Sequence, residues 1–323
     1  MESLSLWFEK LIFGESGPVA DGPAVITLVG SGGKTSLIWL LARRLSQSRS
    51  LRKVLVTPAA KMLLPSRNGC FFDWCYNGAP PAPARGISLS GTFNEKTGKL
   101  ESLPLPELEG IIGGYDVVLI EGDGSKELPL KGWAAHEPVV PSFTGITVGM
   151  LPLWPLGKPV SGKIVHRLPL FRALTGAKPG EALSLDHLAA LISGSQKNGA
   201  HSAARSLRGF SPNDKENAQF CAFSTLQTPK GAQNPGVFAV KGRKNPQVPQ
   251  APRSLFSAAR GKKILFINQI EDEADFSPAR NLVSLLLPEF RSGLHRIIAG
   301  SVRQDTVQEL KLSCPIEDAL NSV

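Results

Sequence analysis

The chain has 323 residues, of which 42% are hydrophobic, and a net charge of +9; this is enough apolar material for one large domain or two modest ones. Only four residues are cysteine, which excludes a small disulfide-stapled secreted protein. No apolar run approaches the roughly 20 residues that a membrane span requires, and the first 13 residues carry Glu2 and Glu9 where a signal peptide carries basic residues. We therefore expect a cytoplasmic protein without a membrane partner.

The positive charge is concentrated in one segment. Residues 196–263 hold 12 lysines and arginines against Asp214 and Glu216, so this segment carries +10 and the rest of the chain −1. The segment is rich in Ser, Pro, Asn, Gln and Gly, a composition that buries too little apolar surface to fold. We predict a basic, disordered insertion at 196–262 and no nucleic-acid partner. It separates a nucleotide-binding core at 1–195 from a C-terminal part at 263–323 that completes the same domain.

The apolar runs predict the fold class. Ala24–Val29 is continuously apolar, and the glycines after it lead into a helix whose leucines recur every three or four residues. Later runs are short, mostly β-branched and do not alternate, which indicates strands covered on both faces. These runs are Val54–Thr57, Val117–Ile120, Ile146–Met150, Ile264–Ile267 and Arg296–Ala299. The pattern predicts an α/β fold like that of P-loop NTPases, with a doubly wound, mostly parallel sheet and flanking helices.

Further elements follow from local signals. Gly86–Leu103 alternates around a turn at Asn94–Gly98, which predicts a small antiparallel excursion at one sheet edge. Ser277 and Pro278 resemble the N-cap and first turn of a helix. We expect helices at Leu168–Leu174, Leu185–Ile192, Pro278–Leu287 and within Val302–Val323.

The strongest chemical signal is a glycine-rich loop between the first strand and its helix. Phosphate oxygens need several converging backbone N–H donors, which glycines and a helix N-terminus supply, while a lysine adds charge and a hydroxyl binds Mg²⁺. The loop is shorter than the common G-x-x-x-x-G-K-[ST] pattern, because its first glycine would fall at Leu28. We assign nucleotide binding to Gly30, Ser31, Gly32, Gly33, Lys34, Thr35 and Ser36.

Acidic residues end the strand that contains Val117–Ile120. Glu121 and Asp123 are two positions apart, which places both side chains on one side of an extended chain. P-loop proteins use carboxylates at such a strand end to hold the water shell of magnesium and to orient an attacking water. We predict that Asp123 and Thr35 contribute to a Mg²⁺ site, and that Glu121 binds the metal or positions the water.

The loop that follows concentrates ionisable groups. Loops at the carboxyl ends of parallel strands form the ligand crevice, so lysines here are suited to phosphate or an anionic substrate, and a histidine to proton transfer or metal binding. We assign Lys126 a catalytic role. The predicted substrate contacts are Lys131, His136, Glu137 and His166.

A later strand ends in a motif related to base recognition. Guanine-binding P-loop proteins place N-K-x-D at such a strand end, and here Asn268, Gln269 and Glu271 occupy the corresponding positions. Glu271 replaces the aspartate, and its extra methylene moves the carboxylate. We predict that the three residues contact the nucleotide, and the choice between ATP and GTP stays open.

Taken together, VGSGGKTS, VVLIEGDGSKELPLKGWAAHEPVVP, VHRLPLFRALTGA and LFINQ resemble the YqeC family, described as accessory factors for selenium-dependent molybdenum hydroxylases or as selenium cofactor biosynthesis proteins. The resemblance covers about Ala24–Ile192 and Lys263–Ser301, and Glu121–Pro141 is its most specific part. It implies a P-loop nucleotide-binding protein that acts in maturation of a molybdenum cofactor. The chain departs from the family at the basic insertion and at Leu168, where the family has proline.

Three functions fit these residues. The favoured one is a Mg²⁺-dependent nucleoside-triphosphate hydrolase, using ATP or GTP, whose partners are a molybdenum hydroxylase or its cofactor-assembly proteins. The second is an ATP-dependent ligase or kinase, because Mur-type ligases also carry a short G-x-x-G-K-T loop. The third is a non-catalytic chaperone that binds nucleotide or cofactor. The hydrolase releases phosphate without an acceptor, the ligase or kinase needs an acceptor, and the chaperone binds nucleotide without turnover.

Overall fold

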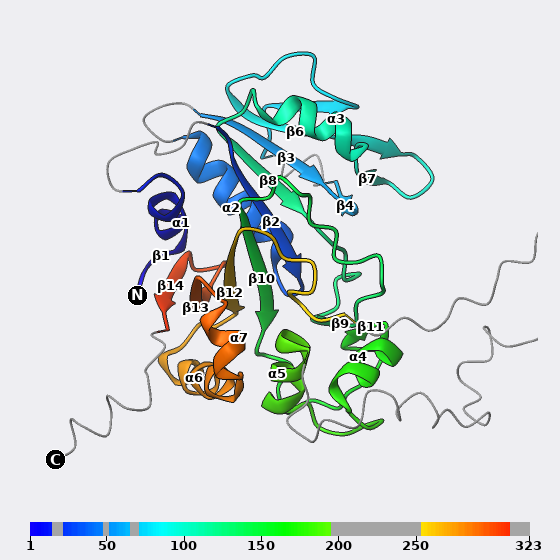
Figure 1. The fold of residues 1–323 in the computed structure, drawn as a ribbon, viewed down its shortest axis with the longest axis vertical. Helices are drawn as coiled ribbons and strands as arrows, with labels where there is room; N and C mark the ends of the chain where they lie inside the picture. The colour runs from blue at the N-terminus through cyan, green and yellow to red at the C-terminus, as the bar shows by residue number, and fades with distance from the viewer. Residues whose placement is uncertain (15–21, 48–51, 65–70, 195–252, 311–323) are drawn as a thin grey trace, which may run out of the picture. The chain divides into compact units, whose positions relative to one another are not determined.

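A sheet whose central strands run parallel organises the fold, with helices on both of its faces (Figure 1). The computed structural model describes residues 1–14, 22–47, 52–64, 71–194 and 253–310. Among these residues, no helix has the length and apolar character needed to cross a membrane. The predicted α/β class is confirmed: the sheet is mixed but mostly parallel.

Six of the described parallel strands coincide with the predicted apolar runs, and those at Gly86–Asn94 and Trp74–Asn77 do not. In spatial order they are β13 (Arg296–Ser301), β12 (Lys262–Asn268), β10 (Ile146–Pro152), β2 (Ala24–Gly30), β8 (Val117–Glu121), β3 (Lys53–Pro58), β6 (Gly86–Asn94) and β5 (Trp74–Asn77). Except in β5, which is mostly exposed, their central residues are almost completely buried, as expected for strands covered on both faces. After β2 the chain builds β3, β6 and β8 on one side, and then crosses to build β10, β12 and β13 on the other.

Antiparallel strands extend the sheet on both sides. On one side β6 pairs with β7 (Lys99–Glu101), which pairs with β4 (Lys61–Leu63), so the predicted excursion is confirmed. On the other, β14 (Thr306–Glu309) pairs with β13 and with β1 (Glu2–Ser3). The prediction of a helix within 302–323 is therefore wrong at β14, because pairing with β13 satisfies its backbone. Residues 311–323 lie outside the described part.

The helices divide between the two faces. On one face α1 (Leu4–Phe13) and α2 (Lys34–Ser46) share a hydrophobic cluster with the sheet. On the other face, α3 (Leu105–Ile112) covers one half of the sheet, and three helices cover the other half. These are α4 (Leu168–Thr175), α5 (Leu185–Ser193) and α6 (Phe276–Leu285), and the short α7 (Pro288–Ser292) follows. This three-layer arrangement confirms the expected flanking helices.

The start of α6 differs from the prediction. A 3₁₀ turn at Glu273–Asp275 leads into the helix, whose N-cap is Asp275 and not Ser277. The Asp275 carboxylate accepts the backbone N–H groups of Glu271 and Asp272, each at 3.4 Å. The turn therefore starts the helix upstream, and Pro278 falls within the first helical turn, where its missing N–H costs nothing.

Residues 253–262, predicted to belong to the basic insertion, are part of the core. Leu255 is fully buried, and its side chain packs against Gly30 at the end of β2. The Phe256 ring contacts Gly149 on β10, and Arg260 exchanges backbone hydrogen bonds with the Thr147 hydroxyl. The predicted C-terminal boundary of the insertion is ten residues too late, because Leu255 and Phe256 are a short apolar pair flanked by polar residues. Residues 196–252 of the predicted segment lie outside the described ones.

Leu255→Ala should lower the free energy of unfolding by about 2–5 kcal/mol, because it leaves a cavity under the loop that follows β2. Denaturant unfolding at pH 7 measures the change. Leu287→Ala is the matched control, since Leu287 is 41% exposed, and it should change stability by less than about 0.5 kcal/mol. Equal effects of the two variants would show that residues 253–262 add nothing to the core.

Candidate functional site

The glycine-rich loop lies where the sheet changes direction. It follows β2, which has β8 on one side and β10 on the other. In doubly wound sheets, the crevice at the carboxyl ends of the strands at such a switch point is the usual ligand site. The loops after β8, β10 and β12 end at the same edge, so they surround the glycine-rich loop.

The first half of the loop is anchored to the protein. The Ser31 N–H donates to the Met150 carbonyl at 3.1 Å, and the Ser31 hydroxyl donates to the Pro129 carbonyl at 2.7 Å. Gly30 has a φ of +100°, and a Cβ there would lie 2.2 Å from the Met150 carbonyl oxygen. Only glycine fits this conformation and this close approach. Gly30 and Ser31 therefore support the loop and do not line the cavity described below.

The second half of the loop presents unpaired donors. The backbone N–H groups of residues 32–36 have no hydrogen-bond acceptor among the described residues. Gly33 adopts a left-handed conformation with a φ of +118° and forms the N-cap of α2 without a side-chain cap. Unpaired N–H groups at the positive end of a helix form an anion site. Gly32, Gly33, Lys34, Thr35 and Ser36 all line the cavity in front of the loop.

A buried carboxylate lies directly beneath the loop. Asp123 is completely buried, and it accepts hydrogen bonds from the Gly30 N–H at 3.1 Å and from the Trp133 Nε1–H at 2.5 Å. Two ammonium groups neutralise it: Lys34 Nζ lies 3.3 Å from Oδ1 and Lys131 Nζ lies 3.1 Å from Oδ2. Every oxygen of Asp123 is thus occupied by protein donors, and Asp123 does not line the cavity.

The charged array continues away from the loop. Lys131 is fully buried and donates to the Gly124 carbonyl at 2.6 Å and to Glu137 Oε2 at 2.8 Å. Arg167 also pairs with the Glu137 carboxylate. Burial by itself raises the pKa of Glu137, but the hydrogen bonds from Arg167 and Lys131 lower it to about 2. Lys131 and Glu137, predicted as substrate contacts, are therefore committed to each other and lie outside the cavity.

Glu121 occupies a different position from Asp123. Glu121 lines the cavity and accepts a hydrogen bond from the Thr35 hydroxyl at 2.9 Å. Its burial raises its pKa, against the opposing effects of the Lys34 charge and the Thr35 hydrogen bond. The two side chains do not share one side of an extended chain as predicted, because β8 ends at Glu121 and the alternation of the strand does not continue to Asp123.

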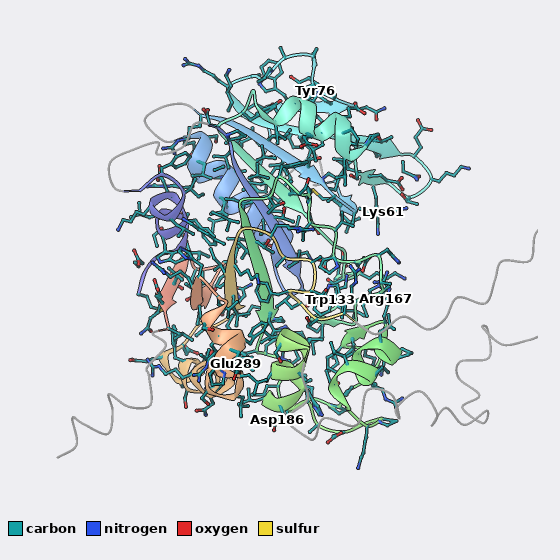
Figure 2. The ribbon with its side chains drawn as sticks, viewed as in Figure 1. Lys61, Tyr76, Trp133, Arg167, Asp186 and Glu289 are labelled. Carbon is teal, nitrogen blue, oxygen red and sulfur yellow. The ribbon has the colours of Figure 1, made fainter. Side chains whose placement is uncertain are left out.

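The cavity in front of the loop has a volume of about 390 Å³. Besides the loop and Glu121, its walls include Lys126 and Gln269, together with Lys61 and Lys99 from the antiparallel edge. Figure 2 labels Lys61 on β4, and Trp133 and Arg167 near the short strands β9 (Leu130–Lys131) and β11 (Val165–His166). Lys61 and Lys99 are not predictable from the sequence, since no local motif connects them to the loop.

A second cavity, of about 590 Å³, borders the same loop. Gly33, Thr35 and Ser36 line it together with the aromatic residues Trp39 and Phe71. Arg43 lies 4.3 Å from the centre of the Phe71 ring and forms a cation–π contact. This cavity therefore combines apolar ring surface with polar groups close to the loop.

The base-recognition motif lies at the second cavity. Gln269 and Glu271 line it, and Gln269 has a φ of +66°. Asn268 is almost fully buried: it donates to the Gly32 carbonyl at 2.7 Å and accepts the Val302 N–H at 3.1 Å. Asn268 therefore links the glycine-rich loop to the end of β13, and it also lines the second cavity.

The two candidate histidines line neither cavity. His136 is exposed. Burial lowers the pKa of His166 to about 4, and the nearby charges of Arg167, Lys131 and Lys126 act in the same direction. The His166 imidazole is therefore neutral at physiological pH, which suits it to structural contacts with the loop after β8.

Comparison with known proteins identifies one family. The family model described as "YqeC protein" matches residues 26–169, which contain the glycine-rich loop, both carboxylates and the Lys131–Arg167 array. A protein of Escherichia coli (strain K12) named "Uncharacterized protein YqeC" is 33% identical over 179 residues, covering 53% of this chain and 68% of that protein. No solved structure matches the chain.

The Glu137 pair should make stability depend on pH. The pKa of Glu137 is about 2 in the folded protein and ordinarily 4.5, so folding favours the ionised form. The resulting stabilisation is complete above about pH 5 and is lost as the pH falls toward 2. The stability difference between wild type and Glu137→Gln should therefore shrink by on the order of 2–3 kcal/mol between pH 5 and pH 2.

Urea unfolding at a series of pH values measures this difference. Glu109→Gln is the control, because Glu109 is exposed on α3 and forms no ion pair among the described residues. Its stability difference from wild type should stay constant. Parallel pH profiles for wild type and Glu137→Gln would show that Arg167 and Lys131 do not stabilise the ionised carboxylate.

Proposed function

Because the chain belongs to the YqeC family and has an anion-binding loop beside a carboxylate–hydroxyl pair, we propose that it is a Mg²⁺-dependent P-loop nucleoside triphosphatase. In this proposal it acts as an accessory factor in maturation of the cofactor of a selenium-dependent molybdenum hydroxylase. The family resemblance of the sequence suggests the pathway. The residues of the site support the nucleotide chemistry.

One observation carries the proposal: residues 32–36, whose backbone N–H groups have no acceptor among the described residues, all line the same cavity, and Lys34 is one of them. Several converging amides and one ammonium suit the β- and γ-phosphates of a nucleotide. Lys34 Nζ donates to the Gly30 carbonyl at 2.5 Å and pairs with Asp123. This holds the ammonium at the base of the loop, ready to neutralise phosphate oxygens.

The residues present suit Mg²⁺. Thr35 Oγ1 and the Glu121 carboxylate are hard oxygen donors 2.9 Å apart on the cavity wall, and Mg²⁺ prefers such ligands together with phosphate and water. When bound, the metal would neutralise charge on the transferred phosphoryl group. Glu121 replaces Asp123 as the proposed metal carboxylate, because Asp123 is already neutralised by two lysines. Asp123 then supports the loop and orients Lys34.

The second cavity suits the nucleoside. It is continuous with the loop through Gly33 and Ser36, and the Trp39 and Phe71 rings provide surfaces for an aromatic base. Gln269 and Glu271 offer hydrogen-bonding groups to a base edge, and Glu271 lies 4.0 Å from the Arg303 guanidinium. In this arrangement the base enters the second cavity, and the terminal phosphate points into the first.

Lys34→Ala should weaken the binding of Mg²⁺–nucleotide by at least about tenfold. Calorimetric titration with ATP and with GTP measures this loss and also decides between the two bases. Lys178→Ala removes an exposed lysine outside both cavities and should bind like wild type. In wild type, inorganic tripolyphosphate should displace nucleotide, a test that depends on no variant. Equal nucleotide affinities of wild type and Lys34→Ala, together with no displacement of nucleotide by tripolyphosphate, would disprove the phosphate-loop assignment.

Glu121→Gln and Asp123→Asn should separate the two carboxylates. Glu121→Gln should reduce the gain in nucleotide affinity that Mg²⁺ provides by roughly tenfold or more, while leaving folding intact, because it removes a buried charge. Asp123→Asn should lower the free energy of unfolding by about 3–5 kcal/mol, because two buried ammoniums lose their counter-charge.

Nucleotide titrations with Mg²⁺ and with EDTA, together with urea unfolding, measure both effects. The substitutions conserve shape, so a difference between the variants reports on charge. The opposite pattern, a metal defect in Asp123→Asn and a stability defect in Glu121→Gln, would exchange the two roles.

A further inference from the structure

The first cavity has a wall that the proposed nucleotide does not use. This wall, here called the lysine wall, consists of Lys61 on β4, Lys99 on β7 and Lys126 in the loop after β8. No single sequence motif contains the lysine wall, because two of its three residues come from the antiparallel edge. Glu121 and Glu127 are the acidic residues on the same cavity lining.

Two of the three ammonium groups lack a counter-charge. Lys61 Nζ pairs with Glu101 at 2.7 Å. Lys99 and Lys126 form neither an ion pair nor a side-chain hydrogen bond with any residue in the described part of the chain. Ammonium groups of one sign in a partly enclosed cavity raise the local concentration of anions. The wall therefore favours an anionic ligand.

The backbone around Lys126 supports a functional interpretation. Lys126 and Glu127 have φ values of 53° and 64°, so two consecutive residues with side chains adopt the left-handed conformation. Each costs on the order of 1 kcal/mol or more, and such strain concentrates at ligand sites. A turn closed by the Leu128 N–H and the Ser125 carbonyl at 3.1 Å holds them. The strained turn keeps Lys126 on the cavity lining.

We propose that the lysine wall binds the phosphate group of a small second substrate, next to the terminal phosphate of the nucleotide. The position of this ligand rests on the proposed function; its anionic character rests on the lysines alone. Lysine is a compact point charge, so two unpaired ammoniums match a dianionic phosphate monoester better than a single carboxylate. The cavity of about 390 Å³ also holds the nucleotide phosphates in this arrangement, which limits the second ligand to a small molecule.

The test uses the full chain saturated with Mg²⁺ and a non-hydrolysable triphosphate analogue, so that the phosphate loop is filled. Glycerol 2-phosphate is then titrated and its binding measured by calorimetry. Wild type should bind one equivalent. A Lys99→Ala and Lys126→Ala double variant, also saturated with the analogue, should bind at least about tenfold more weakly. Equal binding by wild type and the double variant would overturn the proposal.

Lys96→Ala is the matched control. Lys96 lies in the turn between β6 and β7, is exposed and does not line the cavity, so Lys96→Ala removes one positive charge from the hairpin that carries Lys99. It should bind the probe like wild type. The basic residues between 196 and 263 are the same in all variants, so nonspecific anion binding by them contributes equally. If Lys96→Ala loses as much affinity for the probe as the double variant, the effect comes from net charge alone and the proposal is overturned.

Two further arms separate the possible failures. Succinate in place of glycerol 2-phosphate tests the ligand class, and equal affinity for both would overturn the assignment to phosphate. Titration of Lys34→Ala without nucleotide tests the wall separately from the loop. Probe binding that persists in Lys34→Ala supports the lysine wall. It does so even if wild type binds no nucleotide, which is the result that would refute the proposed function. Its loss there would show that the probe occupies the loop, which overturns the proposal.

Discussion

The site depends on the neutralisation of one fully buried carboxylate. Asp123 contacts the Gly30 N–H, the indole of Trp133 and the ammonium groups of Lys34 and Lys131. A buried charge is tolerated only when opposite charges and hydrogen bonds replace its water. The end of β2, the start of α2 and the loop after β8 therefore have to converge on Asp123. This requirement sets the position of the glycine-rich loop.

The convergence divides the loop into two parts with different properties. Contacts with Asp123, Met150 and Pro129 use the polar groups of Gly30 and Ser31. The amides of residues 32–36 are left without acceptors among the described residues. An anion site needs both parts. The rigid support holds the loop in place, so the free N–H donors need no rearrangement when a ligand binds.

The topology of the sheet explains why two cavities meet at this loop. The chain builds strands on one side of β2 and then on the other, so loops from both halves end around the same point. The half that contains β3, β6 and β8 contributes the antiparallel edge and its lysines to the first cavity. The half that contains β12 and β13 contributes Gln269 and Arg303 to the second. A nucleotide that crosses the loop would contact both halves.

The sequence by itself determined the features that depend on near neighbours. A continuous apolar run predicts a buried parallel strand, and a glycine-rich turn before a helix predicts free amides, because both signals lie within a few residues of chain. Only the tertiary structure decided which polar side chains reach the cavity. Glu121 lines it whereas Asp123 and Lys131 are buried in ion pairs, and Lys99 reaches it from a distant hairpin. These outcomes depend on partners that are remote in sequence. A buried charge is stable only where such a partner meets it, and no local sequence pattern contains that information.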